Sequence, residues 1–523
     1  MYWFQTLREL LTPGLMGMLA LAQFTAPAAA QQTTEMRRAA SRQEQPLPLP
    51  ASLPRPSIEP ASNAHGHLPA SFERSTPVAG QVAATAQARD DAFDRSGAHD
   101  TLGALDPDFR SEAERSSFQG PPAGHDPQLF QIEDVDPGQD RRIQHFFEAD
   151  PFQQIGWRLG AFVLFQDLEL ASAWQGNVFL EPDQRVDQRF GFKSETRVVS
   201  NWANHALEFR MLHDRTYHNR FSSENDAQQL YELRGGLDIT RQTRAEVQIA
   251  HEKRQESRGA PDDAGTGDRM RPDVATNRVA GALNHRFNRL SLGLRGGYGE
   301  TRYEAGASGI ADPRNTTVRS IALRAQWEFR PTFSAFGEVE HIARRHPGPA
   351  TSDGLRRNSG GERHRAGVAL GQSGEFLRGE AGIGYGVQRL REATLPDAHA
   401  FLMDANVAWR ITPITSMLFA ASTQIDETTL AGASGVVNRR IGARLRHYFS
   451  RRFLGETGLS YGTQDYRGSP LHEWDVTLKA NAEYTVNRHV SLFGGYEHVR
   501  YRSNADGRDY NASTLMLGAR VRN

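Results

Sequence analysis

Hydrophobic and polar residues alternate along the chain from about residue 152 to its end. Between Trp474 and Val486 every even-numbered residue is apolar, and every odd-numbered residue, from Asp475 to Thr485, is polar. A β-strand separates two such sets onto opposite faces, whereas a helix would mix them. The same alternation recurs within residues 231–239, 321–329 and 377–388. The pattern predicts strands that each have one apolar and one polar face.

Short polar turns separate these strands at intervals of 37 to 48 residues. They are predicted at Asn201, Thr240-Arg241, Asn288-Arg289, Arg330-Pro331, Gln372-Ser373, Thr412-Pro413, Ser450-Arg451 and Asn487-Arg488. Each interval holds two strands and one longer polar loop, as at 256–272, 305–315 and 346–361. Eight turns join sixteen strands, and one strand before (163–174) and one after (511–521) make eighteen. An even number is what single-chain bacterial barrels have.

A repeat of this length is also compatible with a β-propeller, but propeller blades contain four short strands per repeat. The strands here are two per repeat and exceed the roughly 9–11 residues that a tilted membrane-spanning strand needs. Aromatic residues end several apolar faces, as belts at a membrane surface do; they are Trp327, Tyr385, Trp409, Tyr461, Trp474, Tyr484 and Tyr496. An open sheet edge cannot persist in hydrocarbon, so the first and last strands must pair. We predict an all-β transmembrane antiparallel barrel of about eighteen strands over residues 151–523.

The first 150 residues have a different character. Residues 1–30 combine Arg8, the apolar stretch Leu15–Ala22 and small residues up to Ala30, which is the plan of a secretory signal peptide. Residues 31–150 are rich in Pro, Ala and charged residues and show no hydrophobic period, so they cannot bury enough apolar surface to fold. We predict a disordered N-terminal arm that lies in the periplasm.

Composition removes several classes of function. The chain has no Cys, which excludes disulfide scaffolds, thiolate metal sites and thiol catalysis. The 61 Lys and Arg residues against 62 Asp and Glu leave a formal charge of −1, so no overall basic field favours nucleic acid. The mean hydropathy of −0.60, without a long apolar run, excludes a helical membrane protein. No cofactor or metal is expected.

If the apolar faces meet lipid, the alternate residues line the lumen. The lumen-lining candidates are Arg210, Arg234, Arg286, Arg295, Arg324, Arg378, Arg410, Arg440, Arg444, Arg446, Lys479, Glu232, Glu328, Glu380, Asp475 and Glu483. Two interpretations are open. Opposite charges could brace the wall across strands, or Arg side chains, whose planar forks bind carboxylates bidentately, could form a track for anions or an acidic polysaccharide. Arg439 falls on the outward set, so we place it near the rim of the barrel.

Other chemical signals are weak. His213, Asp214 and His218 could suggest an acid–base site, but no Ser lies in a nucleophile elbow, so we expect no enzyme. The His65 and His67 pair lacks a third metal ligand. Asp262, Asp263 and Asp268 do not have the spacing of a calcium-binding EF-hand loop.

Five segments of the chain have strand-like motifs of a recognisable kind, namely Ile155–Phe162, Leu168-Glu169-Leu170, Asn177-Val178-Phe179, Asn204–Glu208 and His285–Leu292. These segments resemble the putative β-barrel porin 2 family of Gram-negative outer-membrane proteins, and the resemblance extends from Phe152 to Asn523. It implies an outer-membrane barrel, often associated with exopolysaccharide or capsule loci. The function expected is a porin-like channel or export component for polar solutes, with surface polysaccharide as the leading candidate.

The expected partners are outer-membrane lipid and lipopolysaccharide, the barrel-insertion machinery, and polysaccharide-export proteins or peptidoglycan, but not nucleic acid. Three alternatives stay open. The barrel could be plugged and serve a structural or adhesive role, it could be a hydrolase, or the chain could be a soluble periplasmic propeller.

Overall fold

The computed structural model describes residues 152, 154–202, 204–256, 271–304, 312–370 and 376–523. The predicted signal peptide, the predicted arm, the His65 and His67 pair, and Asp262, Asp263 and Asp268 lie outside these residues. Within the described ranges, no helix has the length and apolar composition that crossing a membrane requires. Regular structure in these ranges is β-strand, apart from a short 3-10 helix, η1, at Ser222–Glu224.

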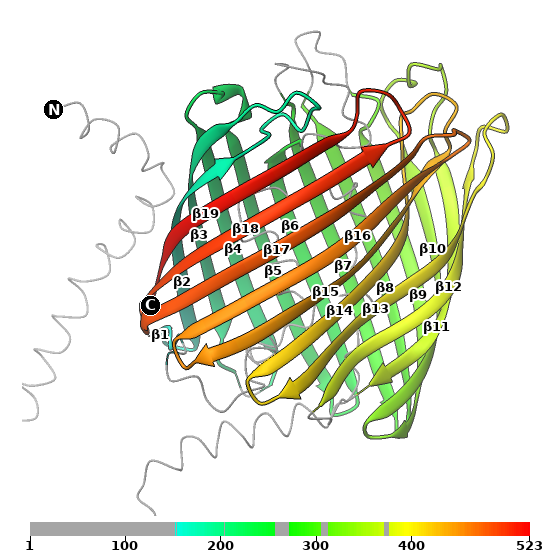
Figure 1. Cartoon of the computed structure of the whole chain (residues 1–523). Coiled ribbons are helices and arrows are strands. Elements are labelled where there is room, and N and C mark those ends of the chain that lie inside the picture. The colour runs from blue at the N-terminus through cyan, green and yellow to red at the C-terminus, as the bar shows by residue number, and fades with distance from the viewer. Residues whose placement is uncertain (1–151, 153, 203, 257–270, 305–311, 371–375) are drawn as a thin grey trace, which may run out of the picture. The chain divides into compact units, whose positions relative to one another are not determined.

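Eighteen long antiparallel strands, β2 to β19, follow one another around a single sheet (Figure 1). The first and last strands pair with each other and close the sheet. The strands are β2 (Phe162–Gln175), β3 (Asp187–Ser200), β4 (Ala206–His218), β5 (Asp226–Thr240), β6 (Thr243–Gln255), β7 (Asp273–Phe287), β8 (Leu290–Tyr303), β9 (Thr316–Arg330), β10 (Phe333–Arg345), β11 (Ser359–Leu370), β12 (Leu377–Leu390), β13 (Ala398–Thr412), β14 (Thr415–Asp426), β15 (Gly435–Ser450), β16 (Phe453–Arg467), β17 (His472–Asn487), β18 (Val490–Ser503) and β19 (Tyr510–Arg522). The predicted barrel and strand count are confirmed.

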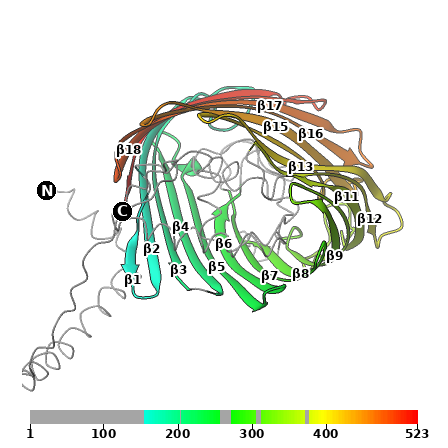
Figure 2. The same ribbon diagram turned by 90° about the horizontal axis from the view of Figure 1, so that it is seen from below.

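The closing seam between β19 and β2 runs from Thr514 opposite Gln175 to Arg522 opposite Asp167. Seen from below, the strands surround a common axis (Figure 2). Closure gives each strand a hydrogen-bonding partner on both sides, which is what makes a sheet compatible with hydrocarbon. The seam links the two ends that sequence reasoning assigned to residues 163–174 and 511–521.

Six of the predicted turns match the observed ones to within a residue, whereas the connection at Asn201 extends from residue 201 to residue 205. Two-residue connections join β5 to β6, β7 to β8, β9 to β10, β13 to β14, β15 to β16 and β17 to β18. Asn288 adopts a φ of 55°, a left-handed conformation that tight turns often require. The Gln372-Ser373 turn lies outside the described residues. The 346–361 loop prediction was too long, because Ser359, Gly360 and Gly361 already pair with β12.

A further short strand was not predicted. β1 (Trp157–Leu159) forms a hairpin with the beginning of β2. Its turn contains Gly160 at φ 63°, a conformation that glycine adopts without steric cost. β19 ends opposite Asp167, so β1 pairs with the part of β2, up to Leu164, that β19 does not reach. The hairpin thereby covers what would otherwise be an unpaired stretch of strand edge.

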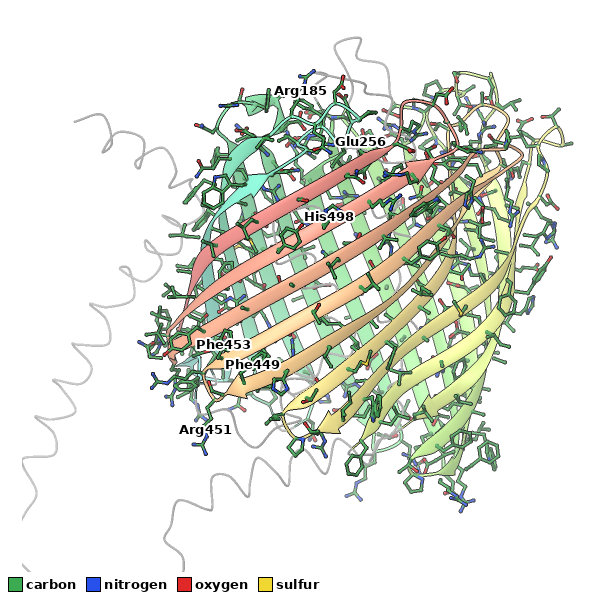
Figure 3. All side chains as sticks on the ribbon, viewed as in Figure 1. Arg185, Glu256, Phe449, Arg451, Phe453 and His498 are labelled. Carbon is green, nitrogen blue, oxygen red and sulfur yellow. The ribbon has the colours of Figure 1, made fainter. Side chains whose placement is uncertain are left out.

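The outer surface of the wall is apolar. Large hydrophobic side chains alternate along the strands as exposed residues, including Leu170, Ile321, Leu323, Ile383 and Leu459. Exposed aromatic residues stand near the short turns, where Phe449 and Phe453 flank Arg451 at the tip of the β15–β16 hairpin (Figure 3). The rings of Phe449 and Phe453 lie 5.4 Å apart. These surfaces fit an apolar band bordered by aromatic residues.

Candidate functional site

The polar face of the sheet is the concave inner wall of the barrel. On β17, Leu478 and Tyr484 are more than 40% exposed, whereas Asp475 and Thr477 are each 2% exposed. Side chains of the polar set also reach one another across several strands, as the Arg324–Glu380 pair does between β9 and β12. Only the concave side of a closed sheet lets side chains converge in this way.

On the inner wall between β9 and β12, an ion pair is supported by an aromatic ring. Arg324 donates two hydrogen bonds to Glu380, at 2.6 and 3.1 Å, which is the bidentate geometry of a strong ion pair. The Arg324 guanidinium carbon lies 3.9 Å from the centre of the Phe336 ring. Gly367 and Gly382 on β11 and β12 leave room for that ring. Arg324 therefore has a carboxylate partner and an aromatic support on the inner wall.

Glu338 is the centre of an adjacent network. Its carboxylate lies 2.5 Å from the guanidinium of Arg365, on β11, and also pairs with Arg295, on β8. The Glu338 side chain is fully buried. Arg365 also contacts Asp404 on β13 at 3.2 Å. One acid thus joins two cations on different strands, and the network extends over β8, β10, β11 and β13.

A third group lies on β15, β16 and β17. Arg440 pairs with Asp475 at 2.9 Å. Arg446 donates to Glu456, and Arg444 lies 3.8 Å from the same carboxylate. Arg440, Arg444 and Arg446, three neighbouring candidates on β15, are therefore divided between two acids.

Arg439 differs from its neighbours in the sequence. It pairs with Asp465 at 2.5 Å, and both side chains are about one-third exposed. His472, at the start of β17, contacts the same carboxylate at 2.7 Å. Arg439 thus lies close to the long-loop end of β15, as its outward position in the sequence predicted.

Further candidates stand in pairs of opposite charge. The pairs are Arg210 with Glu195, Arg234 with Glu232, Arg286 with Glu328, Lys479 with Glu497, and Glu483 with Arg520. Arg378 and Arg410 are half-buried, and the guanidinium carbon of Arg410 lies 5.5 Å from the centre of the Phe376 ring. Most charged side chains on the inner wall thus form pairs of opposite sign, rather than separate positive and negative patches.

Sequence reasoning missed Arg520, which joins both sides of the closing seam. Its Nε lies 2.7 Å from Glu169 on β2, and Nη1 lies 3.1 Å from Glu483 on β17. The alternation along β19 could have identified Arg520 as a lumen residue, because Arg520 falls on the face opposite to the exposed residues Leu517 and Val521. Glu169 was likewise overlooked, since it alternates with Leu168 and Leu170 in the first strand.

The longer loops carry ion pairs of their own. Asp353 accepts hydrogen bonds from the Thr351 hydroxyl at 2.6 Å, the Leu355 amide at 3.1 Å and Arg357 at 2.5 Å. Burial acts to raise the pKa of Asp353, but these three donors hold the pKa at about 2. Arg357 also donates to the carbonyls of Thr428 and Leu430, so it connects the loop after β10 with the loop after β14.

On β4 and the strands beside it, Ser194, His213 and Asp214 are not arranged as a catalytic triad. Within the described ranges, no group of three His, Cys, Asp or Glu side chains is placed to hold a metal ion. Ser194 stands opposite His213 in register, but the Ser194 hydroxyl accepts a hydrogen bond from Gln166 at 3.1 Å, and His213 Nε2 contacts the Tyr231 hydroxyl at 3.3 Å. Asp214 belongs to the opposite face of β4, where it is buried.

Comparison with protein families identifies the barrel. The sequence profile of the family described as "Putative beta-barrel porin 2" matches residues 150–523. The chain belongs to this family. The match covers the whole barrel, so this porin-family protein is an outer-membrane barrel with a transport-like role.

No curated protein matches the sequence. Solved structures that resemble this porin-family barrel include the FrpB iron transporter from Neisseria meningitidis, with 10% identity, a TM-score of 0.39, and 65% of this chain and 61% of that chain covered. The copper transporter OprC has 10% identity, a TM-score of 0.41 and coverages of 70% and 82%. The alcaligin outer membrane receptor FauA from Bordetella pertussis has 9% identity, a TM-score of 0.36 and coverages of 71% and 77%. The chain spans about three-fifths of the FrpB transporter.

Proposed function

We propose that this porin-family protein is a channel through which polar solutes cross the outer membrane. The observation that carries the proposal is the ion-paired inner wall, which runs from Arg324 and Glu380 to Arg440 and Asp475. A barrel of eighteen strands is wide enough to enclose an aqueous passage. A wall of charged side chains would be costly against hydrocarbon but is well solvated against water.

The pairing of charges favours neutral or weakly charged hydroxylated solutes over small ions of one sign. An Arg–carboxylate pair, such as Arg324 with Glu380, has donors and acceptors together and little net charge. A sugar hydroxyl can donate a hydrogen bond to the carboxylate of such a pair and accept one from its guanidinium. Surface polysaccharide, which the family resemblance suggests, is therefore the leading solute in this proposal, and export would be the direction of its transport.

A second candidate is a closed barrel with a structural or adhesive role. The observation that favours it is the near-complete burial of Glu338 and Asp475, whose side chains are at most 3% exposed. Side chains that cover one another this well could narrow the passage. In this case the polar wall would stabilise the barrel without conducting solute.

The short turns are proposed to face the periplasm and the longer loops the exterior, as in other outer-membrane barrels. The predicted signal peptide would direct export, and the predicted arm would then lie in the periplasm. Lipopolysaccharide would surround the long-loop end, and the barrel-insertion machinery would place the closed sheet in the membrane. Polysaccharide-export proteins or peptidoglycan would be reached from the periplasmic side.

Single-channel recording in planar bilayers tests the proposal. The full chain is expected to conduct in KCl, and oligosaccharides added to one side are expected to interrupt the current for measurable times. The same recordings with uncharged polyethylene glycols of increasing size would give the width of the passage. A correctly folded barrel that never conducts would contradict the channel and favour the structural role.

A further inference from the structure

Exposed arginines occupy the short turns of the barrel. They are Arg241, Arg289, Arg330, Arg451, Arg452 and Arg488, which we call the basic rim. These residues come from five different turns, between β5 and β6, β7 and β8, β9 and β10, β15 and β16, and β17 and β18. Figure 3 shows Arg451 at the lower end of the barrel, away from Arg185 and Glu256 at the upper end.

The basic rim has no ion-pair partner among the described residues. The nearby acids Asp238, Glu328 and Glu483 are half-buried and pair with Arg244, Arg286 and Arg520. The turn at residues 371–375, whose sequence includes Glu375, lies outside the described ranges. By contrast, the long-loop end holds both signs in contact, as in Arg357 with Asp353 and Arg314 with Glu256. The rim thus presents one sign of charge, which attracts a partner of the other sign.

The sequence immediately before the barrel is strongly acidic. Residues 100–150 contain twelve Asp and Glu, four Arg and no Lys, a formal charge of −8. Residues 1–99 contain eight acids and eight Arg and are therefore neutral. Residues 151–523 contain 49 Lys and Arg against 42 Asp and Glu, so the barrel has a net positive charge. The near-zero charge of the whole chain is therefore the sum of an acidic segment and a basic barrel.

The acidic segment joins the barrel at the same end as the basic rim. The Phe152 carbonyl accepts a hydrogen bond from Arg522 at 3.3 Å, and its ring centre lies 5.5 Å from the Arg452 guanidinium carbon. Gln154 donates to the Asn523 side chain at 2.8 Å. Phe152 and Gln154 therefore lie beside the basic rim, and residues 100–150 come shortly before them in the sequence.

We propose that the basic rim is a docking surface for residues 100–150 of the same chain. Fifty-one residues are long enough for this, because a random coil of that length has a root-mean-square span of roughly 40 Å and an eighteen-stranded barrel is roughly 35 Å wide. Tethering keeps the acids at a high effective concentration beside the arginines. Arg binds carboxylates bidentately and stacks on aromatic rings, and the segment supplies Phe109, Phe118, Phe130, Phe146 and Phe147. This inference does not depend on what the barrel transports.

Engineered thiols test the docking, because the chain has no cysteine of its own. Ser116→Cys places one thiol in the acidic segment and Thr332→Cys places the other in the β9–β10 turn. In nanodiscs of zwitterionic lipid, with diamide as the oxidant that takes up the two electrons and two protons of the thiols, the full chain is expected to form this disulfide at least five-fold faster in low salt than in 1 M NaCl. The neutralised-rim variant replaces four of the six rim arginines, by Arg241→Gln, Arg289→Gln, Arg451→Gln and Arg488→Gln, and it should weaken that salt dependence and slow the low-salt reaction toward the high-salt rate.

A matched variant changes four exposed arginines at the long-loop end, by Arg185→Gln, Arg302→Gln, Arg356→Gln and Arg391→Gln. It should form the disulfide as fast as the parent. Replacing the four rim arginines by Glu should slow the reaction, and adding Glu112→Arg, Glu114→Arg, Glu133→Arg and Asp134→Arg should restore it. Circular dichroism would establish that each variant keeps its β-structure.

Two results would overturn the proposal. One is a disulfide rate that is the same for the parent and the neutralised rim in low salt. The other is a parent rate that falls to that of the neutralised rim when phosphatidylglycerol is included in the nanodiscs, because lipid headgroups rather than residues 100–150 would then be the occupants of the rim.

Discussion

Phe336 lies over Gly367, its register partner on the neighbouring strand. A Cβ atom added to Gly367 would stand 2.5 Å from Phe336 Cζ and 2.3 Å from the Ala381 carbonyl oxygen. The ring also reaches Gly382 on β12, where an added Cβ would be 3.1 Å away. Gly367 is therefore required both by the ring that supports Arg324 and by the neighbouring backbone, and the ring also limits the space at Gly382.

Gly367→Ala is accordingly expected to destabilise the barrel by about 1–3 kcal/mol, the usual cost of overpacking. The carbonyl contact cannot be relieved by a rotamer change, so the strand itself must shift. Chemical denaturation of the folded barrel in lipid vesicles would measure the loss. Gly337→Ala is the matched control, because an added Cβ there meets nothing within 4 Å; a loss of similar size in this variant would contradict the explanation.

The strands and turns could be predicted from the sequence because both are local signals. Period-two alternation determines which face a residue such as Leu478 occupies, and Asn288-Arg289 marks its turn within a few residues. β1 was missed because three residues are too few to show a period. Its existence follows from the place where β19 ends, which is a property of the closed barrel.

Removing the charge of Glu338 should make the proposed channel more selective for anions. In Glu338→Gln, Arg295 and Arg365 lose the carboxylate they share, and the inner wall gains one net positive charge. Across about 8 Å of water, one charge contributes about 0.5 kcal/mol, or about a two-fold change in relative permeability. Reversal potentials in a KCl gradient would measure it. Glu362→Gln, whose side chain is 47% exposed on the opposite face of β11, should leave the reversal potential unchanged.

Arg520→Gln is expected to weaken the closing seam. It leaves Glu169 and Glu483 without the guanidinium that joins them, and depriving largely buried carboxylates of their hydrogen-bond donor costs about 1–3 kcal/mol. The midpoint of chemical unfolding should fall accordingly. Arg500→Gln, at an exposed position of β18, should change stability by less than about 0.5 kcal/mol. Equal effects of the two substitutions would show that the seam pair has no special role.

The charged character of the inner wall was predictable, but its partners were not. Alternation places Arg324 and Glu380 on one face, yet they are three strands apart, and only the curvature of the closed sheet brings them into contact. Arg440 and Asp475 likewise meet across two strands. The sequence could not distinguish paired from unpaired arginines for this reason, since pairing depends on register and curvature together.

The contact between the loops after β10 and β14 should weaken at alkaline pH. His346 Nε2 lies 3.0 Å from Glu427. Burial acts to lower the pKa of His346, and Arg344 acts in the same direction, but the Glu427 carboxylate and the Pro313 carbonyl outweigh them and raise the pKa above its ordinary value. A raised pKa means that the folded protein binds the proton more tightly than the unfolded chain does. The resulting stabilisation is present below about pH 6.5 and is lost as the pH rises through the raised pKa. Hydrogen exchange of the 346–358 loop should therefore be faster at pH 9 than at pH 5.5 after correction for the intrinsic rate. In His346→Gln this corrected pH dependence should disappear, and its persistence would assign the effect to another group.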